Sequence, residues 1–385
     1  MDRHTQVAVV GGGLVGRVAA IAIARLGLGT LHIAPDGPED WRTSALMGPS
    51  IDLLVTHGLV DRPEDLGVPL KAIRIIDATG RFPRAPETLF EASEAGLERF
   101  GWNFANARLA ETFDSVAAGI DTLASSRTLL QSARRGDGVW HLETADGERQ
   151  TAGLLVGADG RGSRVRDSLG IAHSERAHRQ SALVCDLELA RPLGATSVEF
   201  HYPEGPFTLV PAGDNRANLV WIDRPEILDA SRRTPEDLVA AIAERSQNLF
   251  GTVTVKSGSF VYPLSSIRVR TAGRNSGVLV GEAAHGFPPI GAQGLNLGLR
   301  DVGDLVAALR LANTGAYAWG EPVARSYARM RAGDLARTGQ FVDSLFGSLV
   351  AGGPAGQGLR SAGLWALNAL PALRRQAIAF GLGRG

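Results

Sequence analysis

The sequence predicts an α/β fold, in which a parallel sheet covered by helices receives an inserted, mostly antiparallel sheet and is followed by a helical tail. Three observations support this class. Short apolar runs at 7–10, 154–157 and 277–280 each end in a glycine-containing turn that leads toward a helix-like segment. The middle of the chain alternates apolar and polar residues between short turns. Apolar stripes at helical spacing fill the part beyond about Ser326.

The first apolar run opens a βαβ unit. Its parts are, in order, the strand Val7–Val10, the turn glycines Gly11, Gly13 and Gly16, a helix from Leu14 to about Leu26, and the strand Thr30–Ile33. Glycines in G-x-G-x-x-G order allow a tight turn, close approach of the backbone to a pyrophosphate and close packing of helix on strand. The strand before the turn and the helix after it favour dinucleotide binding over a glycine-rich turn without a ligand.

The acidic residue that usually ends the second strand is absent. In dinucleotide-binding folds an Asp or Glu about 20 residues beyond the glycines holds the ribose hydroxyls. Here Ala34 occupies that position, and Asp36 follows in the loop. Either Asp36 substitutes for the missing carboxylate or the contact is absent. Our hypothesis is that ribose binding is weakened and that cofactor affinity is lower than usual.

A second strand end lies in the middle of the chain. The apolar run from Leu154 ends in Gly-Ala-Asp-Gly, so that Asp159-Gly160 precedes a short basic helix start. Asp159 at the carboxyl end of a strand suits a ribose or backbone contact, and Ser163 suits the N-cap of the next helix. Taken alone, an Asp-Gly pair is more often a simple turn.

The third strand end is the stretch 281–296. It lies between a strand, Gly277–Val280, and a helix, Leu295–Leu311. Glu282 stands just beyond the strand, Pro288-Pro289 follows, and glycines open the helix. Such a turn presents backbone N–H groups and the positive end of a helix dipole to an anion or an electron-rich ring.

The middle of the chain predicts the antiparallel sheet. Strand-like segments separated by short turns are Ala182–Leu189, Ser197–His201, Phe207–Val210, Ala217–Ile222 and Ser259–Tyr262. An amphipathic helix, Pro235–Gln247, lies among them, and we expect further strands at 72–77 and in a hairpin around Asp146-Gly147. Cys185, the single cysteine, lies in an alternating run and is expected to be a buried thiol.

Composition limits the class of protein. The chain of 385 residues exceeds one typical domain, and its 44% of hydrophobic residues suffices for a large core. The balance of 40 basic and 40 acidic residues gives no electrostatic case for nucleic acid. A single cysteine excludes an internal disulfide and a cysteine-based metal cluster, and no metal-ligand spacing is evident. Neither a signal peptide nor a transmembrane span is apparent, so we expect a cytoplasmic protein.

Together, the three turns resemble the motifs of the flavin-dependent aromatic hydroxylases, the group that includes para-hydroxybenzoate hydroxylase. The motifs are Gly11–Gly16, Asp159-Gly160 and Gly281-Glu282, and they occur in the family's order across nearly the whole chain. The family's last motif normally begins Gly-Asp, and Glu282 keeps that carboxylate one methylene further out.

A narrower resemblance is to the ubiquinone-biosynthesis hydroxylases. It rests on Arg42–Ser50, on Gly101–Leu109, which is similar to a Gly-Tyr-x-x-x-Asn-x-x-Leu signature, and on Gly205–Pro211. By this resemblance Arg42 and Asn106 contact the flavin nucleotide. The alternatives are a solvated charge for Arg42 and a helix cap for Asn106.

The resemblance implies how the chain is divided. It predicts a Rossmann-like FAD-binding domain made of 1–75, 100–180 and 265–325, a substrate-binding sheet domain made of 76–99 and 181–264, and a C-terminal helical region, 326–385. In this arrangement the substrate lies between the sheet and the flavin.

The resemblance also implies FAD as cofactor, NAD(P)H or another electron donor as reductant, and molecular oxygen. The residues expected to bind FAD are Gly11, Gly13, Leu14, Val15, Gly16, Arg42, Asn106, Asp159, Gly160, Gly281, Glu282, Pro289, Gly291, Gln293, Gly294, Leu295 and Asn296. Among them the first glycines hold pyrophosphate, and Asp159 and Glu282 hold ribityl or phosphate-side groups. The backbone of 291–296 faces the isoalloxazine ring, where the helix dipole would stabilise negative charge on the reduced ring.

The implied reaction is hydroxylation of the aromatic ring of a polyprenyl-phenol precursor in ubiquinone biosynthesis, through a flavin hydroperoxide. The catalytic residues stay unknown. Candidates on the substrate side are Pro289, through its carbonyl, His201 and Tyr202. His285 is expected to be structural.

Two other functions stay open. One is a flavin monooxygenase or reductase acting on another aromatic or lipid, and the other is a non-catalytic flavin-binding subunit of a quinone-synthesis complex. The C-terminal helices either pack on the core or on a partner chain, or touch a membrane or a quinone-synthesis complex. A homo-oligomer is compatible with the same stripes.

Overall fold

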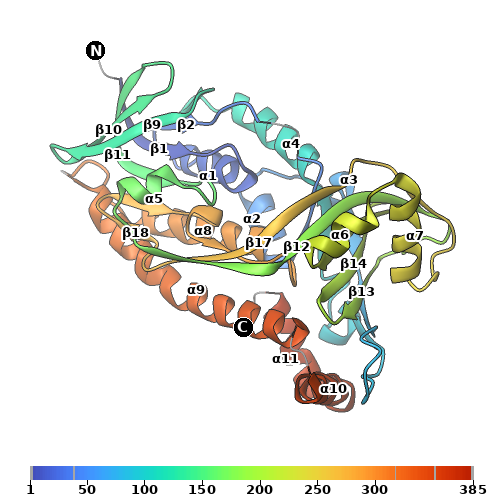
Figure 1. The fold of residues 1–385 in the computed structure, drawn as a ribbon. Coiled ribbons are helices and arrows are strands. Elements are labelled where there is room, and N and C mark those ends of the chain that lie inside the picture. Colours follow the sequence, from blue (N-terminus) through green and yellow to red (C-terminus); the bar gives the residue numbers. More distant parts are fainter. Residues whose placement is uncertain (1–2, 38–39, 317, 351–352, 383–385) are drawn as a thin grey trace.

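The computed structural model describes residues 3–37, 40–316, 318–350 and 353–382. Figure 1 shows two large sheets, and the long strands β12 (His173–Leu189) and β17 (Phe260–Val269) of the second sheet reach from one part of the molecule to the other. Helix α9 (Gly320–Val350) runs past both parts. Parallel and antiparallel sheets, covering helices and a helical C-terminal region are all present, so the predicted fold class is confirmed.

The first sheet is parallel at its centre and is buried on both faces. Val7 and Val9 of β1 pack in one core with helices α1 and α8, whereas Ala8 and Val10 pack in another core with Val165. Because both faces are buried there, the part of β1 from Val7 to Val10 is a continuous apolar run rather than an alternating one. The strand order is β18-β19-β11-β1-β2-β8, and β10 and β9 continue from β11. The bounds are β1 (Arg3–Val10), β2 (Thr30–Ile33), β8 (Leu123–Ser126), β9 (Leu130–Gly136), β10 (Val139–Thr144), β11 (Arg149–Gly157), β18 (Gly273–Arg274) and β19 (Gly277–Leu279).

Helices and a small sheet surround this first sheet. The helices are α1 (Leu14–Ala24), α2 (Gly48–Thr56), α3 (Pro63–Leu66), α4 (Asn106–Ala118), α5 (Arg164–Ser168) and α8 (Gln293–Arg310), with a 3-10 turn η2 (Gly281–Ala283). The small sheet has the order β3-β7-β4 and consists of β3 (Thr43–Met47), β7 (Gly101–Ala105) and β4 (Gly67–Leu70).

The three predicted turns meet at one side of the first sheet. Strands β1, β11 and β19 lie next to one another in parallel register and end close together. The turns that follow them carry Gly11, Asp159 and Gly281. We call this side, where these three residues lie, the ligand edge, because ligands of open α/β sheets bind beyond the carboxyl ends of the strands.

The second sheet is mostly antiparallel, as predicted. Its order is β20-β17-β12-β15-β14-β13-β5-β6, with β16 paired to β12, and β5 alone pairs in parallel with β13 among the described strands of this sheet. Besides β12 and β17 it contains β5 (Ala72–Asp77), β6 (Thr88–Glu91), β13 (Thr196–Tyr202), β14 (Gly205–Pro211), β15 (Arg216–Asp223), β16 (Val253–Val255) and β20 (His285–Gly286). The associated helices are η1 (Ala92–Ala95), α6 (Pro225–Ser231) and α7 (Pro235–Arg245).

The two faces of the second sheet are covered differently. The outer face, which includes Phe200, Leu209 and Trp221, packs with Leu238 of α7 in one apolar core. The inner face carries Ile222 and other residues of opposite parity, and it faces the ligand edge and the C-terminal helices. Cys185 belongs to the outer core and is buried there, which raises the pKa of its thiol to about 12. The predicted buried thiol is therefore confirmed.

The C-terminal helices tie the two sheets together. Val323 and Tyr327 of α9 pack in the core of the first sheet, whereas Phe346 and Leu349 pack against the inner face of the second. After α10 (Gly353–Ala369), helix α11 (Pro371–Gly381) packs Ile378 against the end of the second sheet. Among the described residues, no helix combines the length and the apolar character needed to cross a membrane.

Several predicted boundaries were wrong, among them the start of the C-terminal helical region and the end of one long strand. Helix α9 begins at Gly320, upstream of the predicted start at about Ser326. Pro322 lies in its first turn, where a proline removes no hydrogen bond, so the helix can include it. The strand predicted at Ser259–Tyr262 extends to Val269 as β17.

Candidate functional site

In the glycine turn after β1, Gly13 leaves room for a ligand, whereas Gly11 and Gly16 leave no room even for a methyl group. A Cβ on Gly11 would lie 2.1 Å from the carbonyl oxygen of Ala158, and φ of Gly11 is +126°. A Cβ on Gly16 would lie 2.1 Å from the carbonyl oxygen of Gly11. By contrast, a Cβ on Gly13 would meet no described atom within 4 Å. Gly11 and Gly16 therefore close the turn, and Gly13 borders open space.

Two helices begin at the ligand edge without a side-chain cap. The N-cap of α1 is Gly13, and the N-cap of α8 is Ala292, whose φ is 53°. Neither helix start shows a capping hydrogen bond from its N-cap side chain. The first backbone N–H groups of these helices, at Leu14 and Val15 in α1 and at Gln293 in α8, can therefore bind an anionic or electron-rich group.

The Asp159 side chain is committed to its own turn. It accepts hydrogen bonds from the Ser163 hydroxyl and, at 3.1 Å, from the backbone N–H of Val165. Ser163 in turn caps α5 by accepting from the N–H of Arg166 at 2.9 Å, as predicted. Gly160 has φ +77°, so the turn depends on glycine there.

The Gly281-Glu282 turn is fixed by a hydrogen bond to Asp301 of α8. Gly281, with φ +58°, donates its N–H to Oδ2 of Asp301 at 2.8 Å, and a Cβ on it would lie 3.3 Å from Val15. Glu282 stays half exposed and lies 3.4 Å from the Arg161 guanidinium. The geometry leaves the Glu282 carboxylate accessible at the ligand edge, beside the start of α1.

A buried ionic network lies beneath this turn, and sequence reasoning missed it. Oδ2 of Asp301 accepts from Nε2 of His285 at 2.7 Å, and Oδ1 accepts from Nε of Arg331 at 2.7 Å. Arg331 also donates to Asp304 at 2.8 Å and reaches Asp334 at 2.9 Å. Burial alone would lower the pKa of the Arg331 guanidinium, but Asp301 and its acidic neighbours raise it above the ordinary value.

This network explains His285. Its side chain is buried, is bonded to Asp301 and stacks on Phe287 at a centroid distance of 5.8 Å. Such a position agrees with the expected structural role. A charged residue at an interior position of an otherwise apolar helix face was the signal that could have identified Asp301.

Arg42 and Asn106, the two predicted contacts of the flavin nucleotide, lie together. Arg42 binds Asp40 through Nε at 2.7 Å, and Asn106 donates to Asp40 at 2.9 Å and accepts from the Ser44 hydroxyl at 2.7 Å. Burial would raise the pKa of Asp40, but the bonds from Arg42 and Asn106 lower it below the ordinary value. Asn106 is the first residue of α4 and its side chain does not cap the helix, so the cap alternative was wrong.

The position of the missing acid is visible at the end of β2. A Cβ on Gly12 would lie 3.3 Å from the Cβ of Ala34, so residue 34 adjoins the glycine turn. The neighbouring His32 donates Nε2–H to the carbonyl oxygen of Gly11 at 2.9 Å, and burial lowers the pKa of its imidazole. Asp36 is largely exposed and lies 3.8 Å from Arg127.

The segment 288–296, a loop followed by the first turn of α8, joins the ligand edge to the second sheet. Asn296 uses its side chain within the protein, accepting from the N–H of Met47 at 2.9 Å and donating to the carbonyl oxygen of Ala45 at 2.8 Å. Ile290, next to Pro289, packs with Ile222 of the inner face. Gly291 has φ +62°, and Gly294 is open, with no described atom within 4 Å of a Cβ placed there.

The substrate-side candidates His201 and Tyr202 point to opposite faces of β13. Tyr202 packs against the outer core and donates its hydroxyl to the carbonyl oxygen of Arg245 at 2.8 Å. His201 lies on the inner face and pairs with Glu199 at 2.6 Å. Of the two, only His201 is on the side of the ligand edge.

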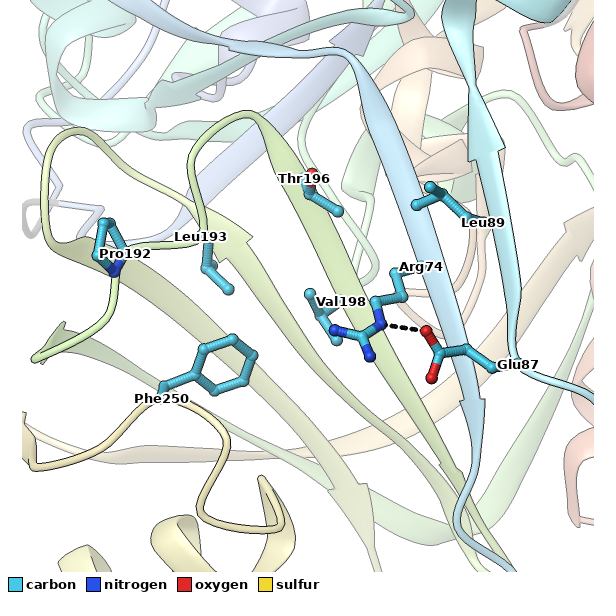
Figure 2. Close-up of a pocket in the computed structure, with 8 residues that line it drawn as sticks. All are labelled: Arg74, Glu87, Leu89, Pro192, Leu193, Thr196, Val198 and Phe250. Atoms are coloured by element: carbon cyan, nitrogen blue, oxygen red, sulfur yellow. Dashed lines mark hydrogen bonds and ion pairs between the residues drawn. The ribbon is translucent and has the colours of Figure 1, made fainter.

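Figure 2 shows the residues that line a pocket. Its volume is about 360 Å³, and none of the lining residues belongs to these turns. Its lining residues include Arg74 of β5 and Val198 of β13, and Arg74 forms an ion pair of 2.6 Å with Glu87. Val198 and Phe250 belong to the outer core, so the pocket opens on the outer face. It is therefore separate from the ligand edge.

A parallel sheet whose edge carries a glycine cradle, an open Gly13 and two uncapped helix starts defines a dinucleotide-binding protein. A model of the family described as "FAD binding domain" matches residues 4–324. Ubiquinone hydroxylase UbiL of Rhodospirillum rubrum is 33% identical, over 80% of this chain and 74% of its own length. The 3-demethoxyubiquinol 3-hydroxylase of Escherichia coli is 30% identical, over 99% of each chain.

A solved structure shows the same fold. The p-nitrophenol 4-monooxygenase PnpA from Pseudomonas putida matches with a TM-score of 0.81 over 100% of this chain and 99% of its own, at 18% identity. The chain therefore belongs to the FAD-dependent monooxygenase family that contains the two hydroxylases. It is an enzyme that binds FAD and uses molecular oxygen together with a reductant.

Proposed function

We propose that this protein hydroxylates the aromatic ring of a polyprenyl-phenol precursor in ubiquinone biosynthesis. The observation that carries the proposal is the similarity to the Escherichia coli 3-demethoxyubiquinol 3-hydroxylase, which extends over 99% of both chains. The apolar part of the inner face of the second sheet, around Ile222 and Ile290, supports it, because a prenylated ring needs an apolar surface beside the flavin.

The residues of the ligand edge divide the binding of FAD among them. The backbone around Gly13 and the start of α1 receive the pyrophosphate, and Glu282 and Arg42 reach the ribityl and phosphate side. The uncapped start of α8, from Gln293 onward, stabilises negative charge on the reduced ring. Bound FAD supplies the activation of oxygen and its transfer to the substrate, and the protein positions the two reactants.

The remaining predicted contacts follow from the same arrangement. Gly160, Gly281, Gly291 and Gly294 allow close approach of the backbone, and Leu295 belongs to the first turn of α8. The Asp159 side chain serves its own turn, so we propose that this segment contributes through its backbone.

We also propose the division of labour between the parts. The segments 1–75, 100–180 and 265–325 hold FAD, the segments 76–99 and 181–264 hold the substrate, and 326–385 covers both. The long strands β12 and β17 run through the first two parts, so the substrate sheet is fixed rigidly relative to the flavin.

Product analysis tests this function. The chain is expressed in bacterial strains that are each blocked at one hydroxylation of the quinone ring, and the quinone that accumulates is identified by mass. Restoration of one step confirms the function and identifies the ring position. If no step is restored although the purified protein is yellow and oxidises NAD(P)H with another aromatic or lipid, the substrate class is wrong. A colourless protein that still binds its pathway partners would favour a non-catalytic subunit.

We further propose that the C-terminal helices touch a membrane surface, where a polyprenyl substrate resides. Trp365 of α10, Leu370 between the two helices and Leu373 of α11 expose 58%, 54% and 39% of their surfaces. A triple substitution of these residues by serine should reduce co-sedimentation with phospholipid vesicles. Substitution is preferable to truncation because Ile378 of α11 packs in a buried cluster with Phe90. Equal pelleting of both proteins would remove the idea.

A further inference from the structure

A buried imidazole, His201, pairs with a partly buried carboxylate, Glu199, on the inner face of the second sheet. Glu199 and His201 are two positions apart on β13, so their side chains share a face. Nε2 of His201 lies 2.6 Å from Oε1 of Glu199. Because a carboxylate can only accept at ordinary pH, His201 donates Nε2–H, which leaves the lone pair on Nδ1.

The other ring nitrogen has no partner in the part of the chain that the structure describes. His201 exposes only 6% of its surface, and its Nδ1 atom is buried without a hydrogen bond to any described residue. A buried polar atom without a partner is uncommon in folded proteins and asks for an explanation. A lone pair held ready in an apolar surrounding is an acceptor for a proton donor that arrives with a ligand.

The location of the pair is given by the strand register. Glu199 lies beside Ile75 of β5 on one side and Thr208 of β14 on the other, and Thr208 lies beside Val220 of β15. Neighbouring strands are about 4.8 Å apart. The pair is therefore within two strands of apolar residues on either side.

Both ends of this row lead to the ligand edge. Val220 packs against the cluster that contains Ile290, the residue after Pro289. At the other end, Ile75 and Met47 pack against the same cluster, and the N–H of Met47 is bonded to Asn296. The pair thus lies on the part of the sheet between two apolar clusters. One contains Ile290 of the segment 288–296, and Met47, which is bonded to Asn296 of that segment, packs against the other.

The other polar groups near the pair already have hydrogen-bond partners. Asp77, beside His201 on β5, accepts from the N–H of Thr79 at 3.0 Å and from the N–H of Ala85 at 2.8 Å. Thr208 donates its hydroxyl to Glu199 at 3.4 Å, which further orients the carboxylate. The arrangement of an acid that orients a histidine whose second nitrogen is free is the arrangement of a general base.

We propose that His201 is the catalytic base that removes the proton from the phenolic hydroxyl of the substrate, and that Glu199 positions it. This inference rests on the proposed function. In the step, the phenolic O–H bond breaks, its proton bonds to Nδ1 of His201, and the electron pair stays on the oxygen. The positive charge of the resulting imidazolium lies beside the carboxylate of Glu199. The phenolate ring is richer in electrons than the phenol and reacts more readily with the oxygen that the cofactor delivers.

The test compares three variants of the full-length protein loaded with FAD. His201→Gln removes the base, and Glu199→Gln keeps a hydrogen-bond acceptor while removing the charge. Tyr202→Phe is the matched control, because it deletes one hydrogen bond from the same strand on the outer face. The probes are 2-methoxyphenol bearing a dimethylallyl chain and its ring-fluorinated analogue, which is more acidic. Hydroxylated product is measured per minute and per NAD(P)H oxidised.

We expect His201→Gln to lose about 10²-fold in product formation with the first probe, the usual contribution of a general base. Glu199→Gln should lose about 10-fold, and Tyr202→Phe should stay close to the wild type. With the fluorinated probe, assayed at a pH above the pKa of its phenol so that it is already ionised, both losses should shrink because no base is needed. A residue that only supports the fold would show equal losses with both probes.

The outcomes separate the two proposals. Equal losses with both probes, or a His201→Gln variant as active as Tyr202→Phe, would overturn the base. If His201→Gln fails to retain FAD, the same comparison is read from Glu199→Gln, whose loss must also shrink with the acidic probe. A wild-type protein that retains FAD but hydroxylates neither probe would count against the proposed function, and the base would fall with it.

Discussion

The two sheets of this protein present their functional residues in different ways. The first sheet does so at the ends of its strands, where Gly11, Gly13 and Gly281 form turns within a few residues of chain. The second does so across its face, where Glu199 and Thr208 meet only because β13 pairs with β14 in one register. Functional residues at a strand end are close together in the sequence, whereas functional residues on a sheet face come together only through the pairing of strands.

The difference is also one of physical tolerance. At the ligand edge, backbone atoms of different turns nearly touch, so an added methyl group at Gly11 has nowhere to go. On the inner face, side chains line a surface that a ligand is to cover, and an exchange of similar size changes chemistry before it changes the fold. The first region should therefore fail through misfolding and the second through slow chemistry. Substitutions that separate these two failures test the comparison.

The largest expected effect is that of Gly11→Ala. The new Cβ would lie 2.1 Å from the carbonyl oxygen of Ala158, and the backbone conformation with φ +126° disfavours any residue but glycine. We expect a loss of about 4 kcal/mol in the free energy of unfolding of the apo-protein, of which overpacking contributes about 3 and backbone strain about 1. Urea denaturation without FAD measures it.

Gly13→Ala is the matched control within the same turn. Its Cβ would meet no described atom, and φ at Gly13 is −71°, which alanine adopts freely. The apo-protein should be as stable as the wild type, but the methyl group should occupy space intended for the pyrophosphate and weaken FAD binding at least about 10-fold, equal to 1.4 kcal/mol. If Gly13→Ala destabilised the apo-protein as much as Gly11→Ala, the turn would be closed throughout and the distinction would be lost.

The second largest effect is expected from Asp301→Asn. Asp301 is fully buried, and it joins the N–H of Gly281, His285 and the guanidinium of Arg331. Removing its charge leaves Arg331 less compensated, which costs about 3 kcal/mol when a buried pair is broken. Thermal unfolding and FAD titration of the variant should both show the loss, because the Gly281 turn is part of the ligand edge.

Asp114→Asn serves as the comparison for this result. Asp114 pairs with Arg17 at 2.7 Å, but its side chain is 60% exposed, so the substitution should cost less than about 1 kcal/mol. Similar losses for both variants would mean that burial of the Asp301 network does not matter. A stable Asp301→Asn protein with weakened FAD binding would mean that the network tunes the site rather than the fold.

The comparison also accounts for what could be predicted from the sequence. Strands Thr30–Ile33 and Ala72–Asp77 have the predicted bounds, because apolar runs between turn residues are local signals. The start of β12 at His173 was missed, because the segment before Ala182 is polar and largely exposed and is held by backbone pairing with β17. Periodicity of side chains cannot reveal a strand that buries few of them.

The site shows the same pattern. Arg42 and Asn106 were identified through a family resemblance, but their shared partner Asp40 was not, although it lies only two residues before Arg42. Glu199 was not identified either, while its neighbour Tyr202 was named and faces the outer core. Alternation along one strand places His201 and Tyr202 on opposite faces. Only the packing shows which of the two faces adjoins the segment 288–296.

A smaller effect, in the opposite direction, is expected from Ala34→Glu. Residue 34 adjoins the glycine turn, so a carboxylate there can accept hydrogen bonds from ribose hydroxyls that Ala34 cannot bind. One added hydrogen bond of about 1 kcal/mol corresponds to roughly fivefold tighter FAD binding. Fluorescence titration of the apo-protein measures the dissociation constant. Unchanged affinity would show that Ala34 does not weaken ribose binding, while the stability of the apo-protein should be unaffected in either case.

The smallest effect concerns the link between Asp40, Arg42 and Asn106, and it depends on pH. Burial raises the pKa of Asp40, but the Arg42 and Asn106 bonds prevail and lower it below 3.8. A carboxyl group with a lowered folded-state pKa adds stability above its unfolded pKa, and that stability is lost as the pH falls through the folded value. The pair is partly exposed, so the contribution at neutral pH should be under about 1 kcal/mol. The unfolding free energies of wild type and Asp40→Asn should therefore differ slightly at pH 7, begin to converge below about pH 4, and meet once the pH is below the lowered folded pKa. Asp36→Asn, in the same loop but 81% exposed, should match the wild type at every pH. A constant gap between wild type and Asp40→Asn down to acidic pH would mean that the loop depends on the shape of Asp40 and not on its charge.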